Sequence, residues 1–235
     1  LSPAEVEVMR RAAVAGQAGM AAGLEAAVPG ATENDVAAAI SSAMFRAGGE
    51  FPAVMPYVAS GPRTMIGHST WEGRTIEPGE HVFLEVGGCY RRYHAAMMRT
   101  VVTGELTDAL HSAQETMKDA LAQVRSLVKP GVPVGRIDSL VRELIEANDV
   151  GAQFVTRAGY SIGIAFPPSW DEGYFLSVME REERPLEEGM TFHIIPWMWG
   201  VGGTQTVGIS DTLAVTADGC ESLFTLPEDF TVHAA

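Results

Sequence analysis

The chain has 235 residues, and 46% of them are hydrophobic, which suffices for one sizeable core. A formal net charge of −14 disfavours nucleic acid and anionic lipid as partners. No apolar run reaches the roughly 18 to 20 residues that a membrane-spanning helix needs, and two cysteines are too few for a disulfide scaffold. We therefore expect one large domain, residues 1–235, that is cytoplasmic and has neither nucleic acid nor a membrane as its partner.

The first part of the chain predicts two helices. Ser2 and Pro3 suit a helix N-cap followed by proline in the first turn, and the apolar and small residues that follow extend the helix to Val28, where Pro29-Gly30 ends it. A second helix is expected from about Thr32 to Ala47, because its first residues resemble a capping box.

A β-rich region follows these helices. A Gly-rich loop, SGPRTMIGHSTWEGR, contains His68 and precedes a predicted strand hairpin, GEHVFLEVGGCYRRYHAAMMRT, at Gly79–Thr100. After a helix-like run at Thr107–Val128, three short strand motifs are predicted: GYSIG at Gly159–Gly163, GMTFHIIP at Gly189–Pro196 and ISDT at Ile209–Thr212.

These motifs, with their Gly, Pro and Arg-Thr residues, resemble those of the creatinase, prolidase and methionine aminopeptidase family. The resemblance implies an α+β pita-bread fold, in which two pseudo-symmetric halves form a curved antiparallel sheet covered by helices. It also implies a homodimer. Because the chain starts at a helix cap and without Met, we expect it to be the catalytic domain alone, with the N-terminal domain of creatinase-like relatives absent from it.

A repeat in the sequence fits two such halves. Glu77-Pro78-Gly79 precedes one β-rich run, and Glu187-Glu188-Gly189 precedes another 110 residues later, so that this offset pairs Glu85 with Ile195. Matched sites on one central cleft would require such an equivalence. The alternative is chance, because turns use Pro and Gly widely.

The metal-binding members of this family hold two metal ions at five positions of these motifs, which fall here on Glu85, Ala96, Tyr160, Ile195 and Ser210. Of these five, only Glu85 carries a carboxylate or an imidazole. Hard divalent ions need several oxygen or imidazole donors, so we expect no tight dimetal site and no other cofactor.

The resemblance and strand geometry together give four catalytic candidates, which are His68, Glu85, His94 and His193. Successive residues of a strand point to opposite faces, so His94 shares a face with Ala96, and His193 shares one with Ile195. Both histidines should therefore face the cleft, although a histidine on a strand also serves as a hydrogen-bonded structural residue. His68 lies where relatives hold a histidine that contacts substrate or transfers protons.

The hairpin from Glu85 to His94 and the GYSIG and GMTFH motifs are most similar to the metal-independent members, creatinase and ectoine hydrolase. This resemblance implies hydrolysis of a C–N bond in a small amidine or guanidine-type compound, with His68 as general base toward water. Glu85 would be the nucleophile or a second base, and His94 and His193 would orient the substrate or protonate the leaving nitrogen. The alternatives are a metal-dependent Xaa-Pro dipeptidase or aminopeptidase, and a degenerate module that binds peptides or ligands without turnover.

Aromatic and cationic side chains beside the motifs are candidates for substrate binding. The aromatic ones suit a box around a delocalised cation, although tryptophan also packs in cores; they are Phe166, Trp170, Trp197 and Trp199. Tyr160, at a former ligand position, is a further candidate. A substrate carboxylate would pair with Arg157, Arg91 or Arg92.

Overall fold

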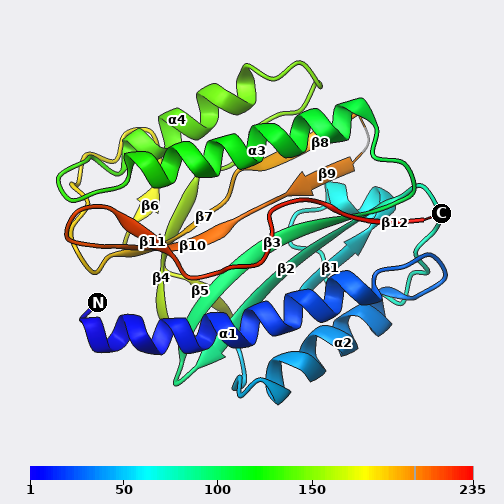
Figure 1. Cartoon of the computed structure of the whole chain (residues 1–235), viewed down its shortest axis with the longest axis horizontal. Helices are drawn as coiled ribbons and strands as arrows, with labels where there is room; N and C mark the ends of the chain where they lie inside the picture. Colours follow the sequence, from blue (N-terminus) through cyan, green and yellow to red (C-terminus); the bar gives the residue numbers. More distant parts are fainter. Residues whose placement is uncertain (204, 235) are drawn as a thin grey trace.

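The computed structural model describes residues 1–203 and 205–234. Within them the helices are α1 (Pro3–Ala26), α2 (Glu33–Arg46), the short 3-10 helix η1 (Gly61–Met65), α3 (Asp108–Leu127) and α4 (Gly135–Glu146). The strands are β1 (Tyr57–Ser60), β2 (His81–Tyr90), β3 (Tyr93–Thr103), β4 (Gly159–Phe166), β5 (Ser169–Asp171), β6 (Ser177–Val178), β7 (Thr191–Ile194), β8 (Trp197–Val201), β9 (Gln205–Gly208), β10 (Asp211–Val215), β11 (Cys220–Ser222) and β12 (Thr231–His233). The pair α1 and α2 lies along one side of the molecule and the pair α3 and α4 along the other, with strands between them (Figure 1).

The first two helices begin where the sequence predicts. The Ser2 hydroxyl accepts a hydrogen bond from the Glu5 N–H, and the Glu5 carboxylate accepts one from the Ser2 N–H. Thr32 and Asp35 form the same reciprocal pair at the start of α2. Each pair satisfies N–H groups that the first helical turn leaves without a partner. The predicted N-cap at Ser2 and the predicted capping box at Thr32 are therefore confirmed.

Ten of the described strands form one sheet. Its path runs β1-β2-β3-β4-β7-β10-β11, with β12 added at β3 and both β5 and β6 added at β4, while β8 and β9 pair separately. Strands β2 and β3 form the long hairpin predicted over Gly79–Thr100. Strand β4 joins the two halves, because it pairs with β3 on one side and with β7 on the other, where Tyr160 lies opposite His193.

The two halves repeat each other in their backbone hydrogen bonds. After α1, the Gly30 N–H donates to the Ile76 carbonyl; after α3, the Gly131 N–H donates to the Leu186 carbonyl. The return bonds run from Ile76 and Leu186 to the residue that follows each glycine. Gly30 and Gly131 also share a left-handed backbone, with φ of 87° and 89°, which glycine adopts without steric cost. The predicted pseudo-symmetry of the halves is therefore confirmed.

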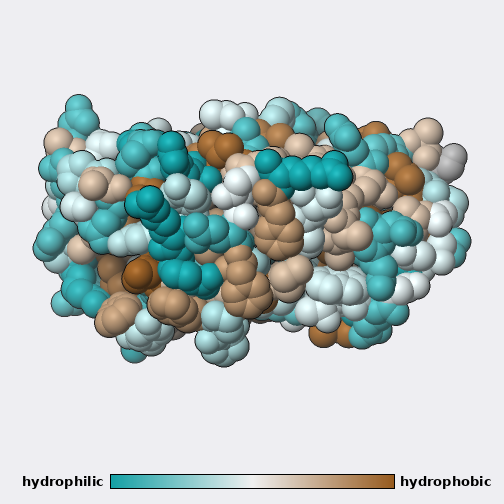
Figure 2. Space-filling model, turned by 90° about the horizontal axis from the view of Figure 1, so that it is seen from below, coloured by the Kyte–Doolittle hydropathy of each residue, from teal (hydrophilic) through white to brown (hydrophobic). Residues whose placement is uncertain are grey.

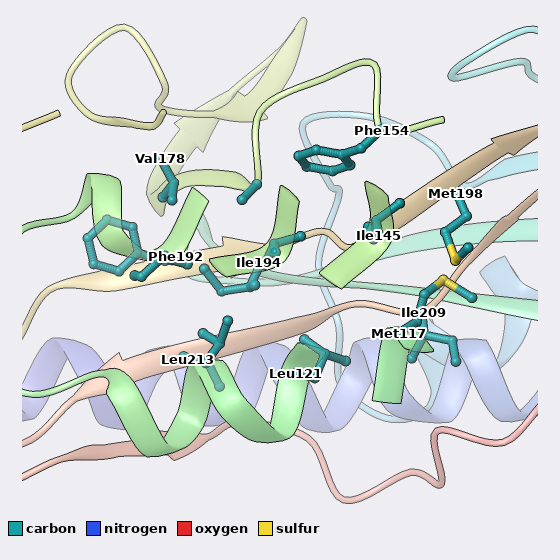
Figure 3. Close-up of a cluster of buried hydrophobic side chains, with 14 of the residues drawn as sticks. Met117, Leu121, Ile145, Phe154, Val178, Phe192, Ile194, Met198, Ile209 and Leu213 are labelled. Atoms are coloured by element: carbon teal, nitrogen blue, oxygen red, sulfur yellow. The ribbon is translucent and has the colours of Figure 1, made fainter. Parts of the chain in front are cut away.

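The buried apolar side chains of the described residues form three groups. The first joins α3 and α4 to the C-terminal strands, and Figure 3 shows Leu121 of α3 and Ile145 of α4 in it together with Leu213 of β10. The second joins α1 and α2 to β1, β2 and β3. Because side chains alternate along a strand, the third lies on the opposite face of β2 and β3, where it includes Ala96 and Tyr160. This last face carries the candidate site.

One face of the surface is largely hydrophilic. On the face that Figure 2 shows, hydrophilic residues cover much of the molecule, and apolar residues form smaller patches between them. In the part of the chain that the structure describes, no helix combines the length and the hydrophobicity needed to cross a bilayer.

Candidate active site

A cavity of about 240 Å³, which we call the cleft, opens beside the third buried group. Its walls come from β1, β2, β4, β5 and β8 and from loops near them; the lining residues are Val54, Tyr57, His68, Glu85, Thr156, Arg157, Tyr160, Ser169, Trp170, Asp171, Ile195 and Trp197. Sites for drug-sized ligands measure about 300–1,000 Å³, so the cleft suits a smaller compound. A larger groove of about 840 Å³ shares Thr156 and Arg157 with it, but the buried carboxylate in that groove, Asp138, is already paired with Arg142.

Glu85 is the buried acidic group of the cleft. Its side chain is fully buried, and neither carboxyl oxygen has a hydrogen-bond partner among the described residues. Burial, and then the charge of Asp171, raises the pKa of Glu85 to about 8, so Glu85 holds a proton at neutral pH. A buried polar group without a partner costs about 1–3 kcal/mol. Such a group in a cleft is the expected mark of a binding or catalytic site.

His68 is the neighbour of Glu85 in the cleft. Its Nε2 lies 3.5 Å from the Glu85 Oε2, and its ring packs against Tyr57 and Trp197, with centroids 5.0 and 5.3 Å away. Half of the side chain is exposed. Desolvation by the surrounding walls nevertheless lowers the pKa of the imidazole. At neutral pH Glu85 therefore holds its proton and His68 is a neutral base.

The His68 loop is held in an uncommon conformation. The backbone of His68 is left-handed, with φ of 56°, which is strained for a residue other than glycine and is found most often at functional sites. Behind it, a Cβ on Gly67 would lie 2.7 Å from the Trp199 ring, so only glycine fits there. Trp199 thus supports the loop and packs against Trp197 with the two rings tilted and their centroids 4.7 Å apart, but it does not line the cleft.

Tyr160 and Trp170 line the cleft, and His193 lies one layer deeper. The Trp170 Nε1 donates a hydrogen bond to the Tyr160 Oη over 3.0 Å, and the same oxygen lies 2.7 Å from the Nδ1 of His193. The Trp170 ring covers Gly87 of β2, where a Cβ would lie 2.7 Å from it. His193 is fully buried, and burial lowers its pKa to about 3. It therefore reaches the cleft only through Tyr160.

His94 does not line the cleft, contrary to the placement predicted from strand parity. It is fully buried, and its Nε2 accepts a hydrogen bond from the Ala53 N–H over 2.9 Å. Parity fixes the face of a strand on which a side chain lies, but not how far along that face a cavity extends. His94 lies on the expected face of β3, where its ring binds the backbone of the loop before β1.

Arg157 is the predicted arginine that reaches the cleft. Its guanidinium forms an ion pair with Asp171, donates to the Ser177 hydroxyl over 2.6 Å, and lies 4.8 Å from the centre of the Tyr160 ring. Its charge is thus already balanced. Arg157 acts as part of the wall, where it fixes Asp171 and covers the ring of Tyr160.

The other predicted cationic and aromatic side chains lie elsewhere. Arg91 and Arg92 occupy the turn between β2 and β3, and Arg92 donates to the Ala165 carbonyl over 2.9 Å. Phe166 is largely exposed and lies against Arg92, 4.9 Å from its guanidinium carbon to the ring centre. The aromatic box around the cleft therefore consists of Tyr57, Tyr160, Trp170 and Trp197, and the structure does not bring Phe166 to it.

The five former metal positions do not fit a pair of divalent ions. Glu85 offers one carboxyl group, while Tyr160 and Ser210 are hydrogen-bonded to His193. Ala96 and Ile195 have no side-chain donor at all. Over residues 1–203 and 205–234, no three His, Cys, Asp or Glu side chains are grouped so that they could hold a metal ion. The donor set lacks the several oxygen or imidazole ligands that such ions need.

Sequence reasoning missed Tyr57 and Asp171. Tyr57 lies directly opposite Glu85 in the pairing of β1 with β2, and burial raises its pKa to about 12. Nothing in the sequence could reveal this before the strand register was known. Asp171 directly follows Trp170. An acidic residue next to a tryptophan already expected to contact a cation was an available signal for Asp171.

The chain is similar to known proteins over most of its length. The sequence model of metallopeptidase family M24 matches residues 7–217. The chain is 32% identical to the ectoine hydrolase of Halomonas elongata over 189 residues, 79% of this chain and 45% of that protein. It is 28% identical to the Xaa-Pro dipeptidase of Pyrococcus furiosus over 221 residues, 93% of this chain and 61% of that protein.

A solved structure carries the same fold. The X-Pro aminopeptidase from Thermotoga maritima superposes with a TM-score of 0.87 at 25% identity, which covers 99% of this chain and 64% of that one. The pita-bread fold predicted from the motifs is therefore confirmed. The chain spans between 45% and 64% of the length of these three relatives.

Proposed function

This chain belongs to metallopeptidase family M24, and on that premise we propose that it hydrolyses a C–N bond in a small cationic amidine or guanidine-type compound without the help of a metal ion. Ectoine is the first substrate to consider, because a relative that is 32% identical is an ectoine hydrolase.

The observation that carries the proposal is the unpartnered carboxyl group of Glu85. Two buried oxygens without hydrogen bonds are complementary to a ligand with two N–H donors and a positive charge, which is what an amidinium presents. The walls around them are aromatic, namely Tyr57, Trp170 and Trp197, and aromatic faces attract a delocalised cation. A bound amidinium would replace the proton that Glu85 holds and would satisfy both oxygens.

The missing metal donors favour the same class of substrate. In a neutral peptide, the carbonyl carbon becomes electrophilic enough for rapid hydrolysis when a metal ion polarises it. Four of the five family ligand positions here hold Ala, Tyr, Ile and Ser. An amidinium carbon already carries positive charge, so it needs no such ion.

The proposed reaction assigns distinct tasks to His68 and Glu85. Neutral His68 takes a proton from water as the water oxygen attacks the amidinium carbon, which is general base catalysis. Glu85, ionised once the cation is bound, pairs with the substrate nitrogens. The resulting neutral tetrahedral intermediate then breaks its C–N bond, and the nitrogen leaves as an amine after it gains a proton.

A metal-dependent Xaa-Pro peptidase is the second candidate, favoured by the 28% identity to an Xaa-Pro dipeptidase over 93% of this chain. The two candidates differ in substrate and in the need for a metal. Turnover of ectoine, hydroxyectoine and creatine should be compared with turnover of an Xaa-Pro dipeptide, each with added Mn²⁺ and with a chelator. Hydrolysis of an amidine or guanidine that the chelator leaves intact supports the proposal. Hydrolysis of the dipeptide alone, with added Mn²⁺, would refute it.

A further inference from the structure

A chain of hydrogen bonds runs from the cleft into the interior through two of the former metal positions. Trp170 donates to the Tyr160 Oη, which lies 2.7 Å from the Nδ1 of His193. The Nε2 of His193 lies 2.6 Å from the Ser210 Oγ, and that oxygen also accepts the Met98 backbone N–H over 2.6 Å. Trp170 and Tyr160 line the cleft, and His193 and Ser210 lie behind them.

The hydrogens along this series of hydrogen bonds can be placed in two ways. His193 is fully buried and its two ring nitrogens face hydroxyl oxygens rather than a carboxylate, so it is a neutral imidazole that carries a single N–H. If that hydrogen is on Nε2, His193 donates to Ser210 and accepts from Tyr160. If it is on Nδ1, His193 donates to Tyr160 and accepts from Ser210.

The two placements leave different hydroxyl hydrogens free. With the hydrogen on Nε2, the Ser210 oxygen accepts two hydrogen bonds, and its own O–H finds no acceptor among the described residues, although Ser210 is fully buried. With the hydrogen on Nδ1, the free O–H belongs to Tyr160, which faces the cleft. A buried unsatisfied donor costs about 1–3 kcal/mol, whereas a donor at the cleft can bind a ligand or water. The second placement is therefore favoured.

We propose that His193 carries its proton on Nδ1 and donates it to Tyr160, so that the Tyr160 hydroxyl donates into the cleft and supplies the proton for the leaving nitrogen. The second half of this statement rests on the proposed function; the first half does not. Tyr160 would then be a catalytic residue that touches the substrate, and His193 a positioning residue that acts through it.

The proton balance of the reaction closes with this assignment, counted from the release of the Glu85 proton to solvent when the amidinium binds. His68 has taken one proton from the attacking water. Tyr160 passes its proton to the nitrogen as the C–N bond breaks, and its phenolate accepts the two N–H groups of Trp170 and His193. The hydroxyl of the intermediate becomes the product carbonyl and gives its proton to Glu85. Protonated His68 returns a proton to Tyr160, which leaves the amide, the amine and a protonated Glu85, the resting state described above.

The tautomer of His193 directly tests the first part of the proposal, that the proton is on Nδ1. In protein labelled with ¹⁵N-histidine, nitrogen chemical shifts distinguish an imidazole protonated on Nδ1 from one protonated on Nε2. The His193 signals are those that disappear in His193→Asn or shift in Tyr160→Phe. A proton on Nδ1 is expected. A proton on Nε2 would overturn the proposal, and this measurement needs no substrate.

Kinetics test the second part of the proposal, that Tyr160 supplies the proton for the leaving nitrogen. Tyr160→Phe keeps the ring and should lower kcat on ectoine about a hundredfold with little change in KM, because a general acid contributes on this scale. His193→Asn, which can still place an N–H toward Tyr160, should keep more of kcat than His193→Leu. Tyr174→Phe, at an exposed tyrosine outside the cleft, is the matched control and should change nothing. An unchanged kcat in Tyr160→Phe would overturn this half, whereas a wild-type protein inactive on every amidine would instead refute the proposed function.

Discussion

The two halves of the molecule share a backbone plan, but they hold two buried groups near the cleft, Glu85 and His193, in different ways. On β2, in the first half, the Glu85 carboxyl has no hydrogen-bond partner within residues 1–203 and 205–234. On β7, in the second half, both ring nitrogens of His193 are bonded, and the position equivalent to Glu85 is the apolar Ile195. A bonded group is held in place, whereas an unbonded one is open to a ligand. Under the proposed function, the first half supplies the carboxyl group that pairs with the substrate, and the second half positions the groups that face it.

The largest effect should follow from loss of the Glu85 charge. Glu85→Gln keeps the shape of the side chain but cannot pair with an amidinium as an ion, and we expect turnover to fall by a hundredfold or more, as for His68→Ala. Glu172→Gln and His111→Ala, outside the cleft, serve as matched controls. Steady-state kinetics and circular dichroism would check activity and fold together. Near-normal rates in both cleft variants would show that neither Glu85 nor His68 takes part in the reaction.

The pH dependence of ligand binding should be the next largest effect. Glu85 must lose its proton to pair with a cation, and its pKa is raised to about 8. Affinity for acetamidinium should therefore rise up to about tenfold per pH unit between pH 6.5 and 8 and then level off. Isothermal titration calorimetry would measure this, with Glu85→Gln as the control that shows a flat profile. An affinity that falls as the pH rises would contradict the assignment of the proton to Glu85.

The stability of the protein should also depend on the protonation of Glu85. Rising pH should lower the free energy of unfolding, whereas it raises the affinity for a cation. The unfolded chain loses the Glu85 proton near pH 4.5, but the folded protein keeps it to about pH 8. Between these values the unfolded state binds fewer protons, so the free energy of unfolding falls with rising pH, by at most about 1.4 kcal/mol per unit. Thermal melts should therefore find Glu85→Gln more stable than wild type at pH 9 and similar to it at pH 4. Equal stability at both pH values would show that Glu85 titrates normally.

The smallest effect on activity is expected at His94, which lies outside the cleft. His94→Ala should leave turnover within about threefold of wild type, yet it should lower stability by about 1–3 kcal/mol, because the Ala53 N–H loses its acceptor. Urea unfolding beside a turnover assay would separate the two. A hundredfold loss of turnover in a stable His94→Ala protein would return His94 to the catalytic group.

Much of this arrangement could be predicted from the sequence, and the limits have physical reasons. Motif spacing and the period of two along a strand brought Glu85 to the cleft, because both depend on local backbone geometry, but His193 lies behind Tyr160 and does not line the cleft as expected. His94 was misplaced because the extent of a cavity depends on loops that pack from far along the chain. The hydrogen bonds that link Tyr160, His193 and Ser210 depend on the register between β4, β7 and β10, which no local pattern fixes.

The most direct test of the account is the metal content of active protein. Elemental analysis and an ectoine turnover assay should be made on one sample before and after treatment with a chelator. The account predicts less than one divalent ion per chain and a rate that the chelator does not change, because four of five family ligand positions carry no suitable donor. Two tightly bound ions per chain, with activity that disappears on chelation and returns with metal, would contradict it.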